Sequence, residues 1–210
     1  MNVLVLGASG RTGRELLAQG VAQGHSVTAF VRNPARLGPA DPKIRIHRGD
    51  VADRASVESV ISGQNAVICA TGTSSHLKPD SKLVIGMHNV ICAMERYDVR
   101  RLIYLSNDSV RDVRYRLNFF RRYLILPLLL HHVVACHETN EAMIKQCSLD
   151  WTIVRPPTLT QGRRMGSCRS GEVVMANSLF PHLSRADLAA FLVKHLTEYT
   201  FLHQAPVVMY

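Results

Sequence analysis

The sequence lacks the features that mark a membrane protein, a disulfide framework or a zinc site. No stretch reaches the roughly 18 consecutive apolar residues that a membrane-spanning helix needs, although 47% of the 210 residues are hydrophobic. The five cysteines are scattered and odd in number, and no two form a Cys-x-x-Cys pair. We therefore expect neither structural disulfides nor structural zinc, and we expect a reducing, cytoplasmic location.

Signals for secretion and for two enzyme classes are missing as well. The first residues, MNVLVLG, carry neither a basic leader nor a small-residue cleavage site, and they predict a first strand rather than a signal peptide. The chain has no Gly-x-Ser-x-Gly elbow and no Walker phosphate loop. The chemistry that depends on either motif is therefore not expected.

Acidic residues are outnumbered by basic ones. The chain has 25 Lys and Arg against 16 Asp and Glu, a formal net charge of +9, and much of the excess lies between Arg100 and Arg122. Such a segment is either a solvated basic face or a surface that attracts an anionic small molecule. Nucleic acid is not expected as a partner, because no recognised reading module accompanies the charge.

Short apolar runs alternate with helical patterns along the chain. This alternation predicts βαβ units and an α/β fold, a doubly wound parallel sheet of the Rossmann type. Without linkers or repeats, we expect one domain over residues 1–210. Strands are expected at 2–6, 26–31, 44–48, 66–69, 101–105, 151–155 and 205–210, and helices at 11–23, 53–62, 80–97, 135–147 and 185–196.

One segment interrupts the alternation after the fifth strand. Residues 114–132 are basic and aromatic at first and then apolar around Pro127. We expect an inserted lid at 110–134, over the strand ends. Contact of 114–132 with a membrane surface is the alternative, because basic residues beside an apolar helix also suit an interface.

A glycine-rich stretch, GASGRTG, lies between the first strand and the first helix. The first glycine allows a tight turn, the second allows close approach of a pyrophosphate, and the third allows the helix to pack on the strand. N–H groups at the helix start favour a phosphate anion. A purely structural turn is the alternative. The stretch predicts a dinucleotide site formed by Gly7, Ser9, Gly10, Arg11, Thr12 and Gly13.

The end of the second strand indicates which dinucleotide is bound. A site for NAD places Asp or Glu there, on the ribose 2′-hydroxyl. This chain has Arg32 at that place and Arg36 one helical turn later. Because a guanidinium binds a phosphate in a bidentate manner, the pattern predicts NADP, with NADPH preferred over NADH. Two ordinary surface arginines are the alternative.

Two further turns are expected at the same edge of the sheet. Gly49-Asp50-Val51 follows the third strand, where Asp50 either accepts a hydrogen bond from the adenine amine or caps the next helix. Ala70-Thr71-Gly72 follows the fourth strand, at the edge where open α/β sheets bind ligands. We expect Asp50, Val51, Ala70, Thr71 and Gly72 to bind the cofactor, with a plain loop glycine as the alternative for Gly72.

The chain resembles the atypical short-chain dehydrogenase family over nearly its whole length. Within that family it is most similar to the group containing biliverdin-IX-beta reductase, also called flavin reductase, and NmrA-like proteins are more distant. The resemblance implies that Ser106, Pro156, Pro157 and Thr158 lie near the nicotinamide. The stretches that carry it are GASGRTG, VRNPARL, RGDV, ATGT, RLIYLSNDSV, LDWTIVRPP and SRADLAAF.

The chain departs from its relatives where the reaction takes place. None of its six tyrosines has a lysine four positions later, so proton transfer by a Tyr-x-x-x-Lys pair is not expected. Ser106-Asn107 replaces the usual Ser-Ser or Thr-Ser, and Thr158 stands where biliverdin reductase has a histidine. We expect Ser106 and Asn107 to be the catalytic side chains, donating hydrogen bonds to a substrate carbonyl or a flavin edge.

These features predict an NADPH-dependent reductase. Its acceptor is a planar conjugated molecule, anionic or aromatic, such as a flavin, a biliverdin-like compound or a quinone, because hydride transfer to it needs little side-chain chemistry. A non-catalytic NADP-binding redox sensor of the NmrA-like kind is the alternative. A monomer or weak homodimer is expected.

Polar side chains on the helix at 135–147 have two interpretations. His137 and Glu141 stand four residues apart, but a solvated helix face explains them as well as a metal does, and no metal is expected. Glu138 and Glu141 are expected to be ordinary helix-surface acids, the alternative being that they shape an active site.

Overall fold

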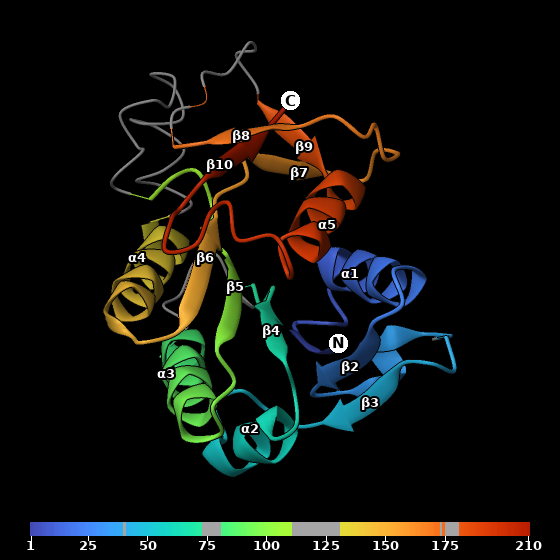
Figure 1. Ribbon diagram of the computed structural model, residues 1–210, viewed down its shortest axis with the longest axis vertical. Helices are drawn as coiled ribbons and strands as arrows, with labels where there is room; N and C mark the ends of the chain where they lie inside the picture. Colours follow the sequence, from blue (N-terminus) through green and yellow to red (C-terminus); the bar gives the residue numbers. More distant parts are fainter. Residues whose placement is uncertain (40, 73–80, 111–130, 173, 175–180) are drawn as a thin grey trace.

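A six-stranded parallel sheet forms the centre of the molecule (Figure 1). This computed structural model describes residues 1–39, 41–72, 81–110, 131–172, 174 and 181–210. The strand order is β3-β2-β1-β4-β5-β6, which reverses direction between β1 and β4 and is the Rossmann order that the sequence predicts. The strands are β1 (Asn2–Leu6), β2 (Ser26–Val31), β3 (Arg45–Arg48), β4 (Ala66–Cys69), β5 (Arg101–Leu105) and β6 (Asp150–Val154).

Helices cover both faces of this sheet (Figure 1). Successive side chains of β1 point to opposite faces: Val3 and Val5 join one apolar core, and Leu4 and Leu6 join the other. The first core includes residues of α1 (Arg11–Ala22) and α5 (Arg185–Lys194). The second includes residues of α2 (Arg54–Ile61), α3 (Ser81–Arg96) and α4 (His131–Gln146).

Side-chain caps fix where two of these helices begin. The Asp53 carboxylate accepts hydrogen bonds from the N–H groups of Ala55 and Ser56, and α2 begins at the next residue. Ser184 Oγ accepts a hydrogen bond from the N–H of Asp187 at 3.0 Å and begins α5 in the same way. These caps therefore explain boundaries that agree with the predicted ranges.

The expected insertion is only partly described. Residues 131–134, which the sequence places in the lid, form the first turn of α4, so this helix begins four residues before the predicted start at 135. Residues 111–130 lie outside the described residues. The lid and the membrane-surface alternative for 114–132 therefore stay predictions. Within the described part of the chain, no helix is long and apolar enough to cross a membrane.

Short strands extend the fold beyond the central sheet. The last predicted strand is β10 (Val207–Met209), which pairs antiparallel with β8 (Arg169–Gly171) and forms a parallel bridge from Val207 to Arg155, just after β6. β7 (Thr158–Thr160) pairs with β9 (His182–Ser184). Three-residue strands carry too little periodicity to be recognised in a sequence, which is why β7, β8 and β9 are not predicted.

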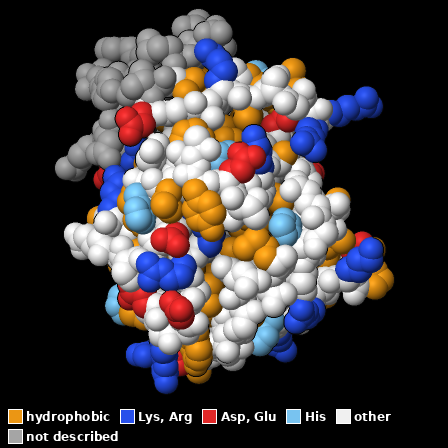
Figure 2. Space-filling model, in the orientation of Figure 1, with side chains coloured by type: hydrophobic (Ala, Val, Ile, Leu, Met, Phe, Trp, Pro, Cys, Tyr) orange, Lys and Arg blue, Asp and Glu red, His pale blue; other side chains and the backbone are white. Residues whose placement is uncertain are grey.

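The basic residues of the described part are dispersed on the face that Figure 2 shows. Lys and Arg side chains are spread over that face, with Asp and Glu among them. Residues 111–122, which carry much of the predicted basic segment, lie outside the described residues.

Candidate active site

The loops that follow β1 and β4 meet at the carboxyl edge of the sheet. Gly7 has a φ of +79°, which side-chain-bearing residues rarely adopt, and a Cβ added to it would lie 2.5 Å from the carbonyl oxygen of Ala70 and 2.9 Å from the nitrogen of Thr71. The two loops therefore touch at the point where the strand order reverses, the place where open α/β sheets bind ligands.

Gly13 holds the start of α1 against the same loop. A Cβ added to Gly13 would lie 2.3 Å from the Gly7 carbonyl oxygen and 2.7 Å from Ala8 Cα. Gly10 is the N-cap residue, and no side chain of the described residues caps the helix there. The first N–H groups of α1 thus face outward at the positive end of the helix dipole, which fits a bound phosphate.

Space for a ligand lies beside these glycines. Among the described residues, nothing lies within 4 Å of a Cβ added to Gly72, whereas a Cβ added to Gly10 would make a tight contact of 3.1 Å with the Gly7 carbonyl oxygen. Ser9 and Thr71 are half-buried beside them, Thr12 is buried at the helix start and Arg11 is exposed. The loop residues predicted to bind a dinucleotide are therefore gathered at one edge, and they fit its phosphates.

Arg32 and Arg36 lie beside this edge, after β2. Both are exposed. The 3₁₀ turn η1 (Pro34–Leu37) is capped by Asn33, whose side-chain oxygen accepts a hydrogen bond from Ala35 N–H. The Arg36 carbonyl accepts a hydrogen bond from Arg14 Nη2 at 2.6 Å, which ties the arginine turn to α1. Two guanidinium groups are thereby placed after the second strand, as the sequence predicts.

Asp50 is not the cap of α2, because Asp53 has that role. The Asp50 carboxylate instead accepts a hydrogen bond from the N–H of Ala52 at 3.0 Å. Its neighbour Val51 packs closely on α3, since a Cβ added to Gly86 would lie 2.7 Å from Val51 Cγ2. The turn after β3 is thus anchored to the sheet edge, and of the two predicted roles for Asp50 only adenine binding stays open.

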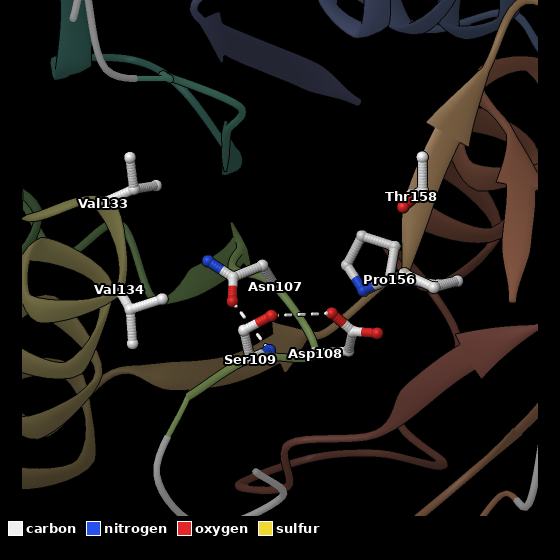
Figure 3. Close-up of a pocket in the computed structure, with 8 residues that line it drawn as sticks. Asn107, Asp108, Ser109, Val133, Val134, Pro156 and Thr158 are labelled. Atoms are coloured by element: carbon white, nitrogen blue, oxygen red, sulfur yellow. Dashed lines mark hydrogen bonds between the residues drawn. The ribbon is translucent and has the colours of Figure 1, made fainter. Parts of the chain in front are cut away.

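A pocket of about 210 Å³ lies between the ends of β5 and β6 and the first turn of α4. Figure 3 shows Val133 and Val134 on one side and Pro156 and Thr158 on the other, with the turn after β5 between them. Since the sheet is parallel, these strand ends are on the same edge as the glycine loop. The lining residues are Asn107, Asp108, Ser109, Val133, Val134, Pro156, Pro157 and Thr158.

Asn107 has a fixed orientation in this pocket. Its Oδ1 accepts a hydrogen bond from the backbone N–H of Ser109 at 2.8 Å (Figure 3). Among the described residues, no acceptor is bonded to its side-chain nitrogen, Nδ2. Because the oxygen is held by an N–H, the amide cannot turn over without losing that bond. Asn107 therefore offers N–H donors to a ligand.

Ser106, in contrast, has its proton committed to Glu141. Its Oγ donates a hydrogen bond to Glu141 Oε1 at 2.6 Å, and only 5% of the residue is exposed. The same carboxylate accepts from Arg155 Nε at 3.1 Å and from Arg155 Nη2. Glu141 is 3% exposed, so the expectation of a helix-surface acid is wrong for it.

A second buried group of polar side chains, on β5 and α4, lies next to the group formed by Glu141 and its partners. The Tyr104 hydroxyl is 2.7 Å from His137 Nδ1, and Asn140 Nδ2 donates to that hydroxyl at 3.1 Å. Burial lowers the pKa of His137 to about 4, although the Glu141 carboxylate opposes this, so His137 is neutral near pH 7. In the neutral tautomer that carries its proton on Nε2, His137 accepts a hydrogen bond from the Tyr104 hydroxyl through Nδ1. Burial also raises the pKa of Tyr104 well above its ordinary value.

These contacts correct the interpretation of α4. His137, Asn140 and Glu141 form a polar stripe on its buried side rather than a solvated face. Within the described ranges, no three His, Cys, Asp or Glu side chains gather as they would around a metal ion. Arg155 is not among the site residues that the sequence predicts, although an arginine at the end of an otherwise apolar strand is a usable signal.

A family model described as NAD(P)H-binding matches residues 7–199. An uncharacterised chloroplastic protein of Arabidopsis thaliana is 30% identical over 201 residues, which cover 90% of this chain and 69% of that protein. The (4-alkanoyl-5-oxo-2,5-dihydrofuran-3-yl)methyl phosphate reductase of Streptomyces griseus is 26% identical over 156 residues, 74% of this chain but only 47% of that protein.

Among solved structures, ChuY from Escherichia coli O157:H7, described as an anaerobillin reductase, has the same fold. The TM-score is 0.81 at 19% identity, and the match covers 99% of this chain and 96% of that one.

Proposed function

Since the chain belongs to the NAD(P)H-binding family, we propose that it is an NADPH-dependent reductase that passes hydride to a planar conjugated acceptor. One juxtaposition carries the proposal: the phosphate-binding start of α1 and the pocket around Asn107 open on the same edge of the sheet. A cofactor bound along this edge would reach from the glycine loop toward the acceptor pocket. Relatives named as reductases support the reaction class.

The cofactor would be held by residues that follow the first four strands, and its phosphates by those after β1 and β2. The N–H groups at the start of α1 bind the pyrophosphate, with Ser9 and Thr12 beside them. Arg32 and Arg36 bind the 2′-phosphate, and Asp50 and Val51 border the adenine. Thr71 and Gly72 lie along the ribose. When bound, NADPH supplies the hydride.

The acceptor would lie between apolar walls. Val133 and Val134 on one side and Pro156 and Pro157 on the other would pack against its ring. Asn107 Nδ2 donates a hydrogen bond to an acceptor oxygen, where negative charge grows as the hydride arrives. The ring delocalises that charge and then takes a proton from solvent, so the pocket needs no side-chain acid. Flavins, biliverdin-like compounds, quinones and unsaturated lactones meet these requirements.

A turnover assay tests the proposal. NADPH absorbance is followed with flavin mononucleotide, biliverdin, small quinones and an alkanoyl-dihydrofuranone phosphate. We expect at least one acceptor to be reduced, and Asn107→Ala to lower kcat/KM about 10- to 100-fold while the Kd for NADPH stays within about twofold. Asn107→Asp, which replaces the donors by an anion, is expected to lose at least as much. Tight NADPH binding without turnover of any acceptor would instead support the non-catalytic sensor.

The choice of NADPH is tested by Arg32→Glu. A carboxylate at this position repels the 2′-phosphate and accepts from a ribose hydroxyl, so we expect the ratio of NADPH to NADH affinity to fall about tenfold or more. Equilibrium fluorescence titration with both nucleotides measures that ratio. The matched control is Arg45→Glu, because Arg45 is also exposed but bonds to Ser26 at the other end of β2. A ratio that responds equally to both substitutions contradicts the assignment.

A further inference from the structure

Glu141 connects the three elements that surround the acceptor pocket. It is bonded to Ser106, which directly precedes Asn107, and to Arg155, which directly precedes Pro156. Glu141 itself lies on α4, about two turns after Val133 and Val134. One carboxylate therefore ties together the turn after β5, the turn after β6 and the helix whose first turn closes the pocket.

The ion pair is buried, although the half-exposed Lys145 places its Nζ 3.6 Å from Glu141 Oε2. Ser106, Glu141 and Arg155 are 5%, 3% and 4% exposed, and the same helix and strands contribute Ile144 and Ile153 to the apolar core. Buried ion pairs of this kind are weak sources of stability, because desolvation offsets most of their attraction, and apolar residues of similar volume often replace them without loss. Stability alone is thus a poor explanation for the pair.

Side-chain hydrogen bonds hold α4 against β5 and the two turns. His137 and Asn140 contact the Tyr104 hydroxyl of β5, and Glu141 contacts Ser106 and Arg155. Ser106 N–H donates to the Val154 carbonyl at 2.8 Å, and Asp108 N–H donates to the Pro156 carbonyl at 3.1 Å, so the two turns hold each other. Among the hydrogen bonds of the described residues, those from Glu141 join α4 to both turns. Glu141 is therefore the α4 side chain that reaches both turns, and the separation between Val133 and Asn107 across the pocket depends in part on it.

We infer that Glu141 is a positioning residue for the reduction, which acts through Ser106 and Arg155 to place the Asn107 amide and the α4 wall against the acceptor. It touches neither substrate nor cofactor. The inference rests on the proposed function and assigns Ser106 a different part from Asn107: Ser106 anchors the turn, and Asn107 donates to the acceptor. A pair that served only stability would be dispensable once stability is restored by other means.

A charge-free double variant separates these possibilities. Glu141→Leu alone removes the carboxylate that faces a buried guanidinium, and we expect a large fall in Tm. Glu141→Leu combined with Arg155→Met is expected to regain the Tm of the unmodified protein. At that restored stability, kcat/KM for the acceptor is expected to remain about tenfold or more below normal, while the Kd values of NADPH and of adenosine 2′,5′-bisphosphate change by no more than about twofold.

A second measurement does not depend on turnover. The side-chain amide of Asn107 gives a pair of resonances in ¹⁵N-labelled protein, identified by their loss in Asn107→Ala. We expect these resonances to shift or broaden in the stable double variant, because the turn that fixes Asn107 has lost its anchor. If the unmodified protein reduces no acceptor, the proposed function fails and the resonances alone decide the positioning role. Two results would overturn the inference. One is a double variant with normal Tm, unchanged Asn107 resonances and unchanged acceptor kinetics. The other is a double variant that stays as unstable as Glu141→Leu, because the ion pair would then act through stability.

Discussion

Gly13→Ala is expected to lower NADPH affinity about 100-fold and to destabilise the fold by about 3 kcal/mol. The added methyl group would lie 2.3 Å from the Gly7 carbonyl oxygen and 2.7 Å from Ala8 Cα. Both neighbours are backbone atoms, so neither can rotate away as the end of a side chain does. Either α1 moves off the loop or the loop changes shape, and the N–H groups at the start of the helix then lose their common direction. Thermal unfolding and NADPH titration measure the two effects.

Gly72→Ala is the matched control for this change. Among the described residues, nothing lies within 4 Å of a Cβ added to Gly72. The same one-methyl addition should therefore leave the Tm unchanged and reduce only NADPH affinity, because the methyl group enters the space proposed for the cofactor. Gly13→Ala with normal Tm and normal affinity would show that the loop does not hold the phosphates in the way described.

Acidification is expected to destabilise the protein through His137. Burial lowers its pKa to about 4 from an ordinary value of 6.5, so between these two values the unfolded chain binds more protons than the folded one. Stability rises with pH wherever the unfolded state binds more protons, and His137 therefore lowers the free energy of unfolding as the pH falls through this window. A difference of about 2.5 pKa units corresponds to roughly 3 kcal/mol between pH 7 and pH 4.

The comparison with His137→Gln isolates this effect from the titration of carboxylates. Glutamine carries no titrating group, while its amide can still face the Tyr104 hydroxyl. Denaturant unfolding at a series of pH values from 7 to 4 should show a smaller loss of stability in the variant, by about 3 kcal/mol. Equal acid sensitivity in both proteins would mean that His137 is not buried in its neutral form.

The sequence predicts the glycine loop and the arginine turn better than it predicts the contacts around Asn107. The loop from Gly7 to Gly13 and the arginines after β2 are recognisable because their roles depend on positions next to strands, and apolar runs locate strands well. α4 is harder to interpret. Its buried side mixes Val134 and Ile144 with His137, Asn140 and Glu141, and a rule that assigns polar residues to solvent places these three on the wrong side.

The direction of hydrogen bonds also explains why the roles of Ser106 and Asn107 are hard to predict from the sequence. Ser106 and Asn107 are adjacent and both can donate, so the sequence gives no reason to separate them. The structure separates them by their contacts. Ser106 donates its hydroxyl proton to Glu141, whereas Asn107 accepts from Ser109 N–H through its oxygen and keeps its nitrogen available as a donor. Partners 35 residues away in the chain, as Glu141 is from Ser106, have no local pattern from which they can be inferred.

Equilibrium titration of the unmodified protein with NADPH and with NADH tests the central claim most directly. If the edge formed by the glycine loop, Arg32 and Arg36 is the cofactor site, the Kd for NADPH is expected to be at least about tenfold lower than the Kd for NADH. The reason is that only NADPH carries the 2′-phosphate that the two guanidinium groups bind. Equal or tighter binding of NADH, or no binding of either nucleotide, contradicts the account.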